Sequence, residues 1–147
     1  MTYGIPGLTA SSAGTRAVVG HGVHPQAARV LAELGGDGAG FAARQLNTRL
    51  ASDADLVLTM TRAHRDVVLE LAPRQLRKTF TLIEAARLVT EYGAYTVAEL
   101  AARRSFLDSD AVLDVPDPIG HGSDVFTAVA HQINTLLHPV LPLCQPD

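Results

Sequence analysis

The stretch VPDPIGHG, residues 115–122, holds an aspartate, Asp117, between two prolines. Because proline fixes φ and has no amide donor, we expect a stiff loop here and not a helix or a central strand. A carboxyl group held out on a rigid loop can donate a proton to a leaving group. The alternative is a turn aspartate that bonds to its own backbone, and the local sequence alone favours that alternative.

The one cysteine of the chain, Cys144, lies three residues from its end. A reactive thiolate needs a positively charged pocket or a helix N-terminus, and the sequence supplies neither after Cys144. We therefore interpret it as a tail thiol and not as a nucleophile. A single cysteine also excludes an internal disulfide and a thiolate metal cluster.

The six histidines do not form a recognisable metal-binding motif. His21 and His24 have two residues between them, but no cysteine or carboxylate accompanies them at ligand spacing, so we predict no metal site. His131 and His138 are expected to be surface or half-buried residues of the last helix and not ligands, while His121 follows the Asp117 loop and could lie near a substrate. The glycine cluster GGDGAG lacks the Lys-Ser/Thr of a nucleotide-binding loop and is interpreted as a helix end and a turn. No cofactor is predicted.

Short apolar runs alternate with amphipathic segments along the chain. Thr61 and Ser123 are expected to cap the helices that follow them, and Pro139 is expected to end the last helix. Val125, Val129, Ile133, Leu136 and Val140 are expected to form the buried stripe of that helix. Alternating strands and helices predict an α/β layer fold with a parallel sheet. Strands are predicted over residues 9–13, 54–60 and 80–83, and helices over 24–35, 41–52, 61–73, 84–93, 96–105 and 124–137.

The composition is that of an ordinary globular chain. It has 147 residues, 47% of them hydrophobic and 18% charged, with a net charge of −3. This length predicts one domain over 1–147, and the charge gives no reason to expect nucleic acid or an anionic membrane as a partner. No apolar run approaches the ~18 residues of a membrane span, and the first residues do not have the pattern of a secretory signal, so we expect a cytoplasmic protein.

Several segments, taken together and in order, resemble the low-molecular-weight protein tyrosine phosphatases. They are SSAGTRAVVGHGVHPQAARVLAELG, FAARQL, SDADLVLTMTRAHRDVVLELAP, FTLIEAARL and DVPDPIG. The resemblance extends over nearly all of residues 10–137. It implies a three-layer, doubly wound α/β fold with a small parallel sheet, and hydrolysis and dephosphorylation of phosphotyrosine.

The resemblance also assigns roles to residues. A Cys-x5-Arg loop after the first, central strand would bind phosphate, its cysteine attacking phosphorus and its arginine holding the phosphoryl oxygens. Asp117 matches the general acid, which protonates the departing oxygen and then serves as the base for water. Ser12 matches the serine that hydrogen-bonds to the phosphate loop. Eukaryotic members follow Asp-Pro with a tyrosine pair, whereas here Ile119 and Gly120 follow, so no tyrosine-phosphorylation switch is implied.

The nucleophile loop has no counterpart in these residues. Only MTYGIPGLTA precedes SSAGT, and a strand, a loop and a helix would need roughly 30 residues more. We therefore expect an N-terminally truncated member without its central strand, with residues 1–8 as the remnant of the first helix and 142–147 as a tail. The strands at 9–13 and 54–60 would then close up and pair, receive a strand from another copy in a homodimer, or leave the chain marginally folded.

Two functional hypotheses follow. The first is a phosphatase whose N-terminal part is missing from this chain, which an in-frame Cys-x5-Arg coding segment upstream of Met1 would support. The second is a pseudophosphatase that acts as a binding or dimerising module. Arsenate reductases share the ancestral fold but need several cysteines, so Cys144 alone argues against that activity.

Overall fold

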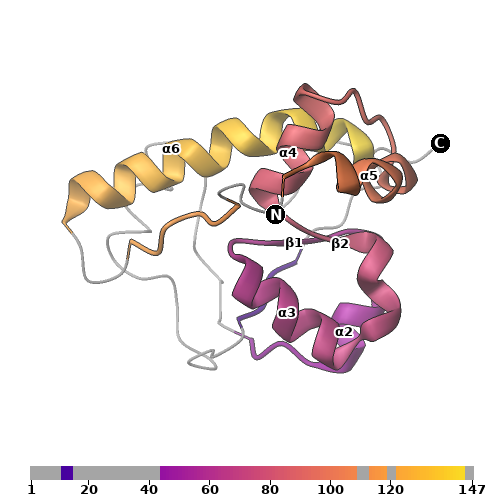
Figure 1. Ribbon diagram of the computed structural model, residues 1–147. Coiled ribbons are helices and arrows are strands. Elements are labelled where there is room, and N and C mark those ends of the chain that lie inside the picture. The colour runs from indigo at the N-terminus through magenta and orange to yellow at the C-terminus, as the bar shows by residue number, and fades with distance from the viewer. Residues whose placement is uncertain (1–10, 15–43, 109–112, 119–121, 145–147) are drawn as a thin grey trace.

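The computed structural model describes residues 11–14, 44–108, 113–118 and 122–144 (Figure 1). The predicted helix over 24–35, residues 1–8 and residues 145–147 lie outside these ranges. In chain order the elements are α2 (Thr48–Asp53), β1 (Val57–Thr59), α3 (Arg62–Leu71), the 3₁₀ helix η1 (Pro73–Lys78), β2 (Thr79–Thr81), α4 (Leu82–Thr90), α5 (Val97–Arg103), η2 (Arg104–Phe106), α6 (Ser123–Val140) and η3 (Leu141–Cys144).

The sheet is small and parallel, as predicted. β1 pairs with β2 in the register Val57 to Thr79 and Thr59 to Thr81. Among the described residues a further parallel bridge joins Gly14 to Gln45, in which Gly14 donates to the carbonyl of Arg44 and accepts from the amide of Leu46, both at 2.9 Å. The bridge lies just after the strand predicted at 9–13: residues 11–13 are not assigned to a strand, and residues 9 and 10 lie outside the described ranges.

Helices cover both faces of the two strands. Figure 1 shows α4, α5 and α6 on one side of β1 and β2, and α2 and α3 on the other. This is the three-layer arrangement of an α/β fold, because each face of a parallel sheet must be buried.

Of the two helix caps expected from the sequence, Thr61 is confirmed, and two further helix starts differ from the predicted element boundaries. The Thr61 hydroxyl accepts the amide of His64 at 3.1 Å at the start of α3, as predicted. The predicted strand over 80–83 is wrong in its second half, because Thr81 and Glu84 form a reciprocal capping box that starts α4 at Leu82. Asn47 caps α2, so residues 44–47 of the helix predicted over 41–52 are not helical, and residues 41–43 lie outside the described ranges.

The last helix also differs at both ends from its prediction. Gly122 is the N-cap of α6 and Ser123 is its first helical residue, so Ser123 does not cap it. The helix does not end at Pro139, which has no amide N–H to donate, but continues to Val140, which is 1% exposed. Phe126 is buried, whereas Val125 is 36% exposed, so the buried stripe begins one residue later than predicted.

The hydrophobic core has two parts. The main core lies between β2, α4, α5 and α6, and its buried members are Phe80, Ala85, Ala86, Leu88, Ala94, Leu100 and Val140. The smaller cluster lies on the other side of the sheet, between α2 and α3, with Ala51, Val68 and Ala72 buried and Leu46 and Val57 packed against it.

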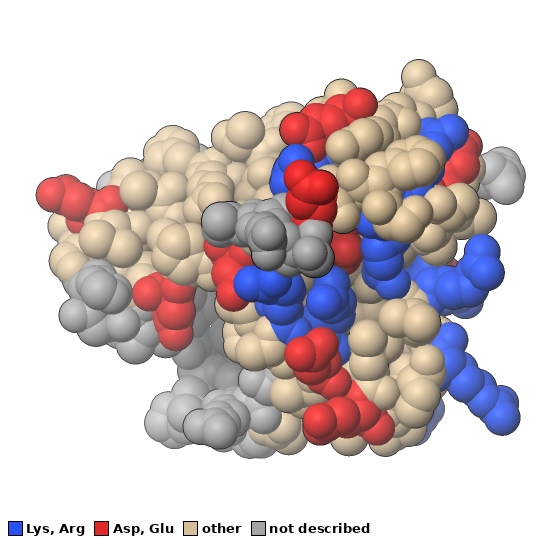
Figure 2. All heavy atoms as spheres, viewed as in Figure 1, with Lys and Arg blue, Asp and Glu red and all other residues tan. Residues whose placement is uncertain are grey.

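A buried carboxylate, that of Glu84 in α4, forms ion pairs with arginines of α3 and η2. Glu84, 3% exposed, lies 3.4 Å from the guanidinium nitrogens of both Arg65 and Arg104. Arg104 also donates to the carbonyls of Leu76 and Thr79. Its guanidinium stacks 4.0 Å from the centre of the Phe80 ring, although its Nε–H is not aligned for a hydrogen bond with Glu84. Elsewhere, the face in Figure 2 carries acidic and basic side chains interspersed, with no large area of one sign.

Candidate active site

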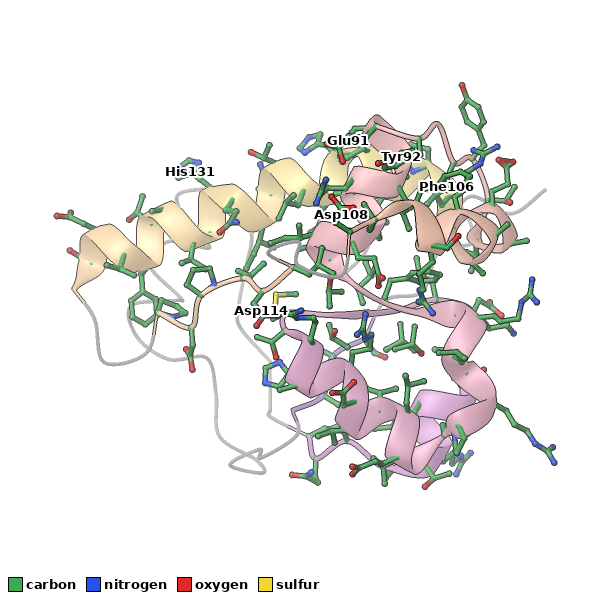
Figure 3. All side chains as sticks on the ribbon, viewed as in Figure 1. Glu91, Tyr92, Phe106, Asp108, Asp114 and His131 are labelled. Carbon is green, nitrogen blue, oxygen red and sulfur yellow. The ribbon has the colours of Figure 1, made fainter. Side chains whose placement is uncertain are left out.

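The loop that carries Asp117 is fastened to the carboxyl end of β1. The amide of Val115 donates to the carbonyl of Met60 at 2.8 Å. The carboxylate of Asp114 accepts the amide of Arg62, the first residue of α3, also at 2.8 Å. Figure 3 shows Asp114 beside this start of α3. The loop is therefore held by backbone and side-chain bonds just before Asp117.

Asp117 itself is exposed and lines a cavity of about 670 Å³. The carboxyl ends of parallel strands are where α/β proteins bind ligands, and Met60 and Thr59 at that end of β1 line the same cavity. The described lining consists of residues 11–14, Arg44, Leu46, Leu50, Ala51, Ala54, residues 56–60, His64, Val68 and Asp117.

Ser12, the other residue that the resemblance singled out, lines this cavity as well. Its carbonyl accepts two donors of the Arg44 guanidinium, Nε at 3.3 Å and the second terminal nitrogen at 3.1 Å. The structure thus brings Ser12 and Asp117, 105 positions apart in the sequence, to one cavity, with Arg44 holding the Ser12 segment.

Sequence reasoning did not single out Arg44 and His64 as residues of this site. Both line the cavity, and they are the positively charged or titratable side chains that share it with Asp117 among the described residues. His64 follows β1 by a few residues, in the first turn of α3. Its position just after the strand predicted at 54–60 was a usable signal, because residues that follow parallel strands gather at one edge of the sheet.

Cys144 does not contribute to the described lining of the cavity. It lies half-buried in η3, where burial raises the pKa of its thiol. A raised pKa keeps the thiol protonated at neutral pH, which agrees with the prediction that it is not a nucleophile.

The described histidines outside the cavity do not form a cluster. His131 and His138 are exposed on α6 (Figure 3 labels His131), and His138 Nδ1 lies 2.7 Å from the carbonyl of Asn134. Within the described ranges no three His, Cys, Asp or Glu side chains are placed to hold a metal ion. His21, His24 and His121 lie outside those ranges.

Comparison with known proteins identifies the family. Residues 1–142 match the family model of the low-molecular-weight phosphotyrosine protein phosphatases. The low-molecular-weight protein-tyrosine-phosphatase Wzb of Salmonella typhi is 31% identical over 124 residues, which is 84% of this chain and 67% of that protein. Wzb of Escherichia coli K12 is 43% identical over 68 residues, 46% of each chain.

Solved structures share the fold. The tyrosine phosphatase AmsI of Erwinia amylovora superimposes with a TM-score of 0.68 at 22% identity, covering 91% of this chain and 73% of that one. The YwlE arginine phosphatase of Geobacillus stearothermophilus gives a TM-score of 0.70 at 29% identity, covering 92% and 73%. The chain therefore belongs to the low-molecular-weight phosphotyrosine protein phosphatase family.

The helices of the described part of the chain do not include one that is both long and apolar enough to span a membrane.

Proposed function

We propose that this chain provides the proton-transfer part of a phosphomonoester hydrolase acting on phosphotyrosine in cytoplasmic phosphoproteins. The observation that carries the proposal is the placement of Asp117 on a cavity at the carboxyl end of β1, with its loop fastened through Val115 and Asp114. Family membership and the order of the sequence motifs support the assignment.

In the proposed reaction a cysteine thiolate attacks phosphorus and the bond to the phenolic oxygen breaks. Asp117 transfers its proton to that oxygen, so that a neutral phenol leaves. The resulting carboxylate then takes a proton from water, and the water oxygen attacks phosphocysteine to release phosphate and regenerate the thiolate. Ser12 would hydrogen-bond to the loop that carries the nucleophile.

The 147 residues alone do not contain that nucleophile. The sequence has one cysteine, which burial keeps protonated in η3, and no Cys-x5-Arg motif. We therefore propose that the isolated 147-residue chain does not turn over and that the phosphate loop comes from residues outside it. In isolation the chain would behave as a non-catalytic, pseudophosphatase-like module.

A phosphoarginine substrate is the second candidate, because a structure that is 29% identical to this chain is an arginine phosphatase. The two substrates differ in the bond that breaks, which is P–O in one and P–N in the other. Acid catalysis by Asp117 would serve either reaction, because each leaving group departs more readily once protonated.

The test compares the 147-residue chain with the same chain fused, upstream of Met1, to the strand, phosphate loop and helix of a family relative. We expect no hydrolysis of p-nitrophenyl phosphate by the first and clear hydrolysis by the second. A phosphotyrosine peptide and a phosphoarginine peptide, offered to the fusion, separate the two substrates. Turnover by the 147-residue chain itself would overturn the proposal.

A further inference from the structure

The 3₁₀ helix η1 carries basic side chains that form no ion pair within the described ranges. Arg74, Arg77 and Lys78 are exposed there. Every other arginine side chain in those ranges forms an ion pair with a carboxylate or, in the case of Arg44, donates to the carbonyl of Ser12. Among the described residues, the cations of η1 are therefore the ones left to bind another molecule.

The sequence around these cations supplies no neutralising charge. It has no acidic residue between Glu70 and Glu84. Glu84 is 3% exposed and already lies between the guanidinium groups of Arg65 and Arg104. Figure 2 shows basic side chains toward the right-hand edge of the view, where Figure 1 places the connection from α3 to β2. A short positive surface thus lies on a chain whose net charge is −3.

An apolar side chain is exposed within this positive segment. Leu76 stands between Arg74 and Arg77 in the sequence of η1, and it is 52% exposed. A lone exposed leucine is ordinary on a protein surface. In this place, however, it lies among cations that have no counter-charge. The segment therefore fits a ligand that offers carboxylates together with an apolar group.

The backbone of η1 is held in place from two sides. Gln75 is 7% exposed, and its side-chain amide donates to the carbonyls of Ala51 at 2.7 Å and Ala54 at 2.9 Å. From the other side, Arg104 donates to the carbonyl of Leu76 at 2.9 Å. Because these bonds already fix the segment, a ligand does not have to order its backbone, and the entropy cost of binding is smaller.

This surface lies at the opposite end of the sheet from Asp117. The cavity is at the carboxyl end of β1, whereas η1 ends at Lys78, directly before the first residue of β2. The two strands are parallel, so η1 lies at their amino end. None of the exposed side chains of η1 belongs to the described lining of the cavity. A molecule bound to η1 therefore leaves the cavity free.

We propose that η1 is a docking surface for an acidic segment of a partner protein. Carboxylates of the segment pair with Arg74, Arg77 and Lys78, and one apolar side chain of the segment covers Leu76. The two arginines can each bind a carboxylate through two parallel N–H donors. This interaction goes beyond the proposed function, because it uses the other end of the sheet and no step of the hydrolysis.

The size of the surface and the charge of the chain favour a protein segment over other anions. A 3₁₀ helix rises about 2 Å per residue, so Arg74 and Lys78 are about 8 Å apart along its axis. An extended peptide of about three to five residues spans that length. The net charge of −3 opposes a long polyanion or an anionic membrane. A phosphate backbone also offers no apolar group to cover Leu76.

The probe is a fluorescent peptide of about nine residues, long enough to extend past the surface at both ends. It carries two glutamates on each side of a central leucine, with glycine and serine at the ends. The control peptide has glutamine in place of every glutamate. Fluorescence anisotropy measures binding to the 147-residue chain at about 20 mM and about 150 mM NaCl. We expect saturable binding of the acidic peptide, weaker at the higher salt concentration, and at least about tenfold weaker binding of the control.

Matched variants of the chain locate the site. Arg77→Gln and Arg87→Gln each remove one positive charge, but Arg87 lies in α4 and pairs with Glu91. We expect Arg77→Gln to weaken peptide binding by about threefold and Arg87→Gln to leave it within about twofold. Leu76→Ser keeps every charge and is also expected to weaken binding by about threefold.

The triple variant Arg74→Gln, Arg77→Gln and Lys78→Gln is expected to weaken binding by at least about tenfold. Two of these cations lie in the last turn of η1, where they also offset the helix dipole. Urea unfolding midpoints are therefore measured for each variant. Leu76→Ser, which leaves the dipole and the cations as they are, keeps the test decisive if the triple variant is destabilised.

Equal binding of the two peptides, equal losses for Arg77→Gln and Arg87→Gln, or no binding would overturn the docking surface. Tighter binding of a single-stranded oligonucleotide or of phosphatidylglycerol vesicles would identify another class of ligand and would also overturn it. Self-association of the chain that Arg77→Gln abolishes would identify a second copy as the occupant, with the same consequence. Hydrolysis is not measured in these experiments. An inactive fusion protein would therefore contradict the proposed function alone, and an active fusion that does not bind the peptide would contradict only this inference.

Discussion

The carboxylate of Asp114 accepts the amide N–H of Arg62 at 2.8 Å, across 52 positions of sequence. The bond adds a side-chain acceptor to the first turn of α3, where the backbone donors have no partner within the helix. It also fixes the loop three residues before Asp117. The same hydrogen bond therefore stabilises the start of α3 and holds the loop that carries Asp117, the proposed acid.

Replacing Asp114 by alanine is expected to destabilise the protein by about 1 kcal/mol, the typical value of a helix N-terminal acceptor. Asp114→Asn keeps an oxygen acceptor and loses only the ion pair with Arg62, in which both side chains are nearly half exposed, so it should cost much less. Urea unfolding of the two variants measures the difference. Equal losses would mean that the charge, and not the hydrogen bond, matters.

Replacing Asp117 by asparagine in the fusion protein is expected to lower kcat by about 10²–10⁴-fold for phosphate esters with poor leaving groups. The loss should shrink for p-nitrophenyl phosphate, whose leaving group needs little protonation. Rates across a series of aryl phosphates give this dependence. Asp114→Asn is the control, because it leaves the acid in place, and a loss independent of the leaving group would assign Asp117 a structural role.

Replacing Glu84 by alanine is expected to cost about 3–5 kcal/mol, the range for removing one partner of a buried ion pair. The change removes the capping box of α4 and leaves Arg104 without its counter-charge, although burial already lowers the pKa of Arg104. Glu84→Gln keeps the acceptor for the Thr81 amide and should cost less. Urea unfolding midpoints of the two variants measure the difference. A loss below about 1 kcal/mol for Glu84→Ala would show that the ion pairs of Glu84 contribute little to stability.

The thiol of Cys144 should give stability a distinct pH dependence. Burial raises its pKa above the unfolded value, so the folded protein disfavours the thiolate. Its contribution is therefore complete below the unfolded pKa and is lost as pH rises toward and through the folded pKa. Urea midpoints between about pH 7 and 10 should fall more steeply for the parent than for Cys144→Ser. Parallel curves would contradict the burial of this thiol.

Alkylation gives an independent check of the same residue. Iodoacetamide should modify Cys144 more slowly in the folded protein than in urea at the same pH, since the thiolate is the reactive form.

The sequence predicted elements where a single local signal decides the structure. The apolar run at 54–60 contains β1, and Thr61 caps α3 as its position before a periodic segment indicated. The start of α4 at Leu82 was not predicted, because the apolar residues there favoured a strand. The capping box formed by Thr81 and Glu84 starts the helix at this point. Ser123 was a reasonable cap by type, yet Gly122 holds that position.

The site could be predicted only in part. Asp117 follows from a Pro-Asp-Pro loop together with the family motif, and both are visible in the sequence. Arg44 and His64 line the same cavity because the ends of parallel strands bring distant segments to one edge of the sheet. A local sequence pattern does not predict this proximity.

The two hydrophobic clusters differ in what borders them among the described residues. Residues of α4, α5 and α6 pack around Phe80 and Leu88 in the main core. In the smaller cluster, Ala51 and Val68 line the cavity that Asp117 also lines. Large-to-small substitutions in the main core should therefore lower the free energy of unfolding and leave the lining of the cavity unchanged, whereas substitutions of Ala51 or Val68 should change both.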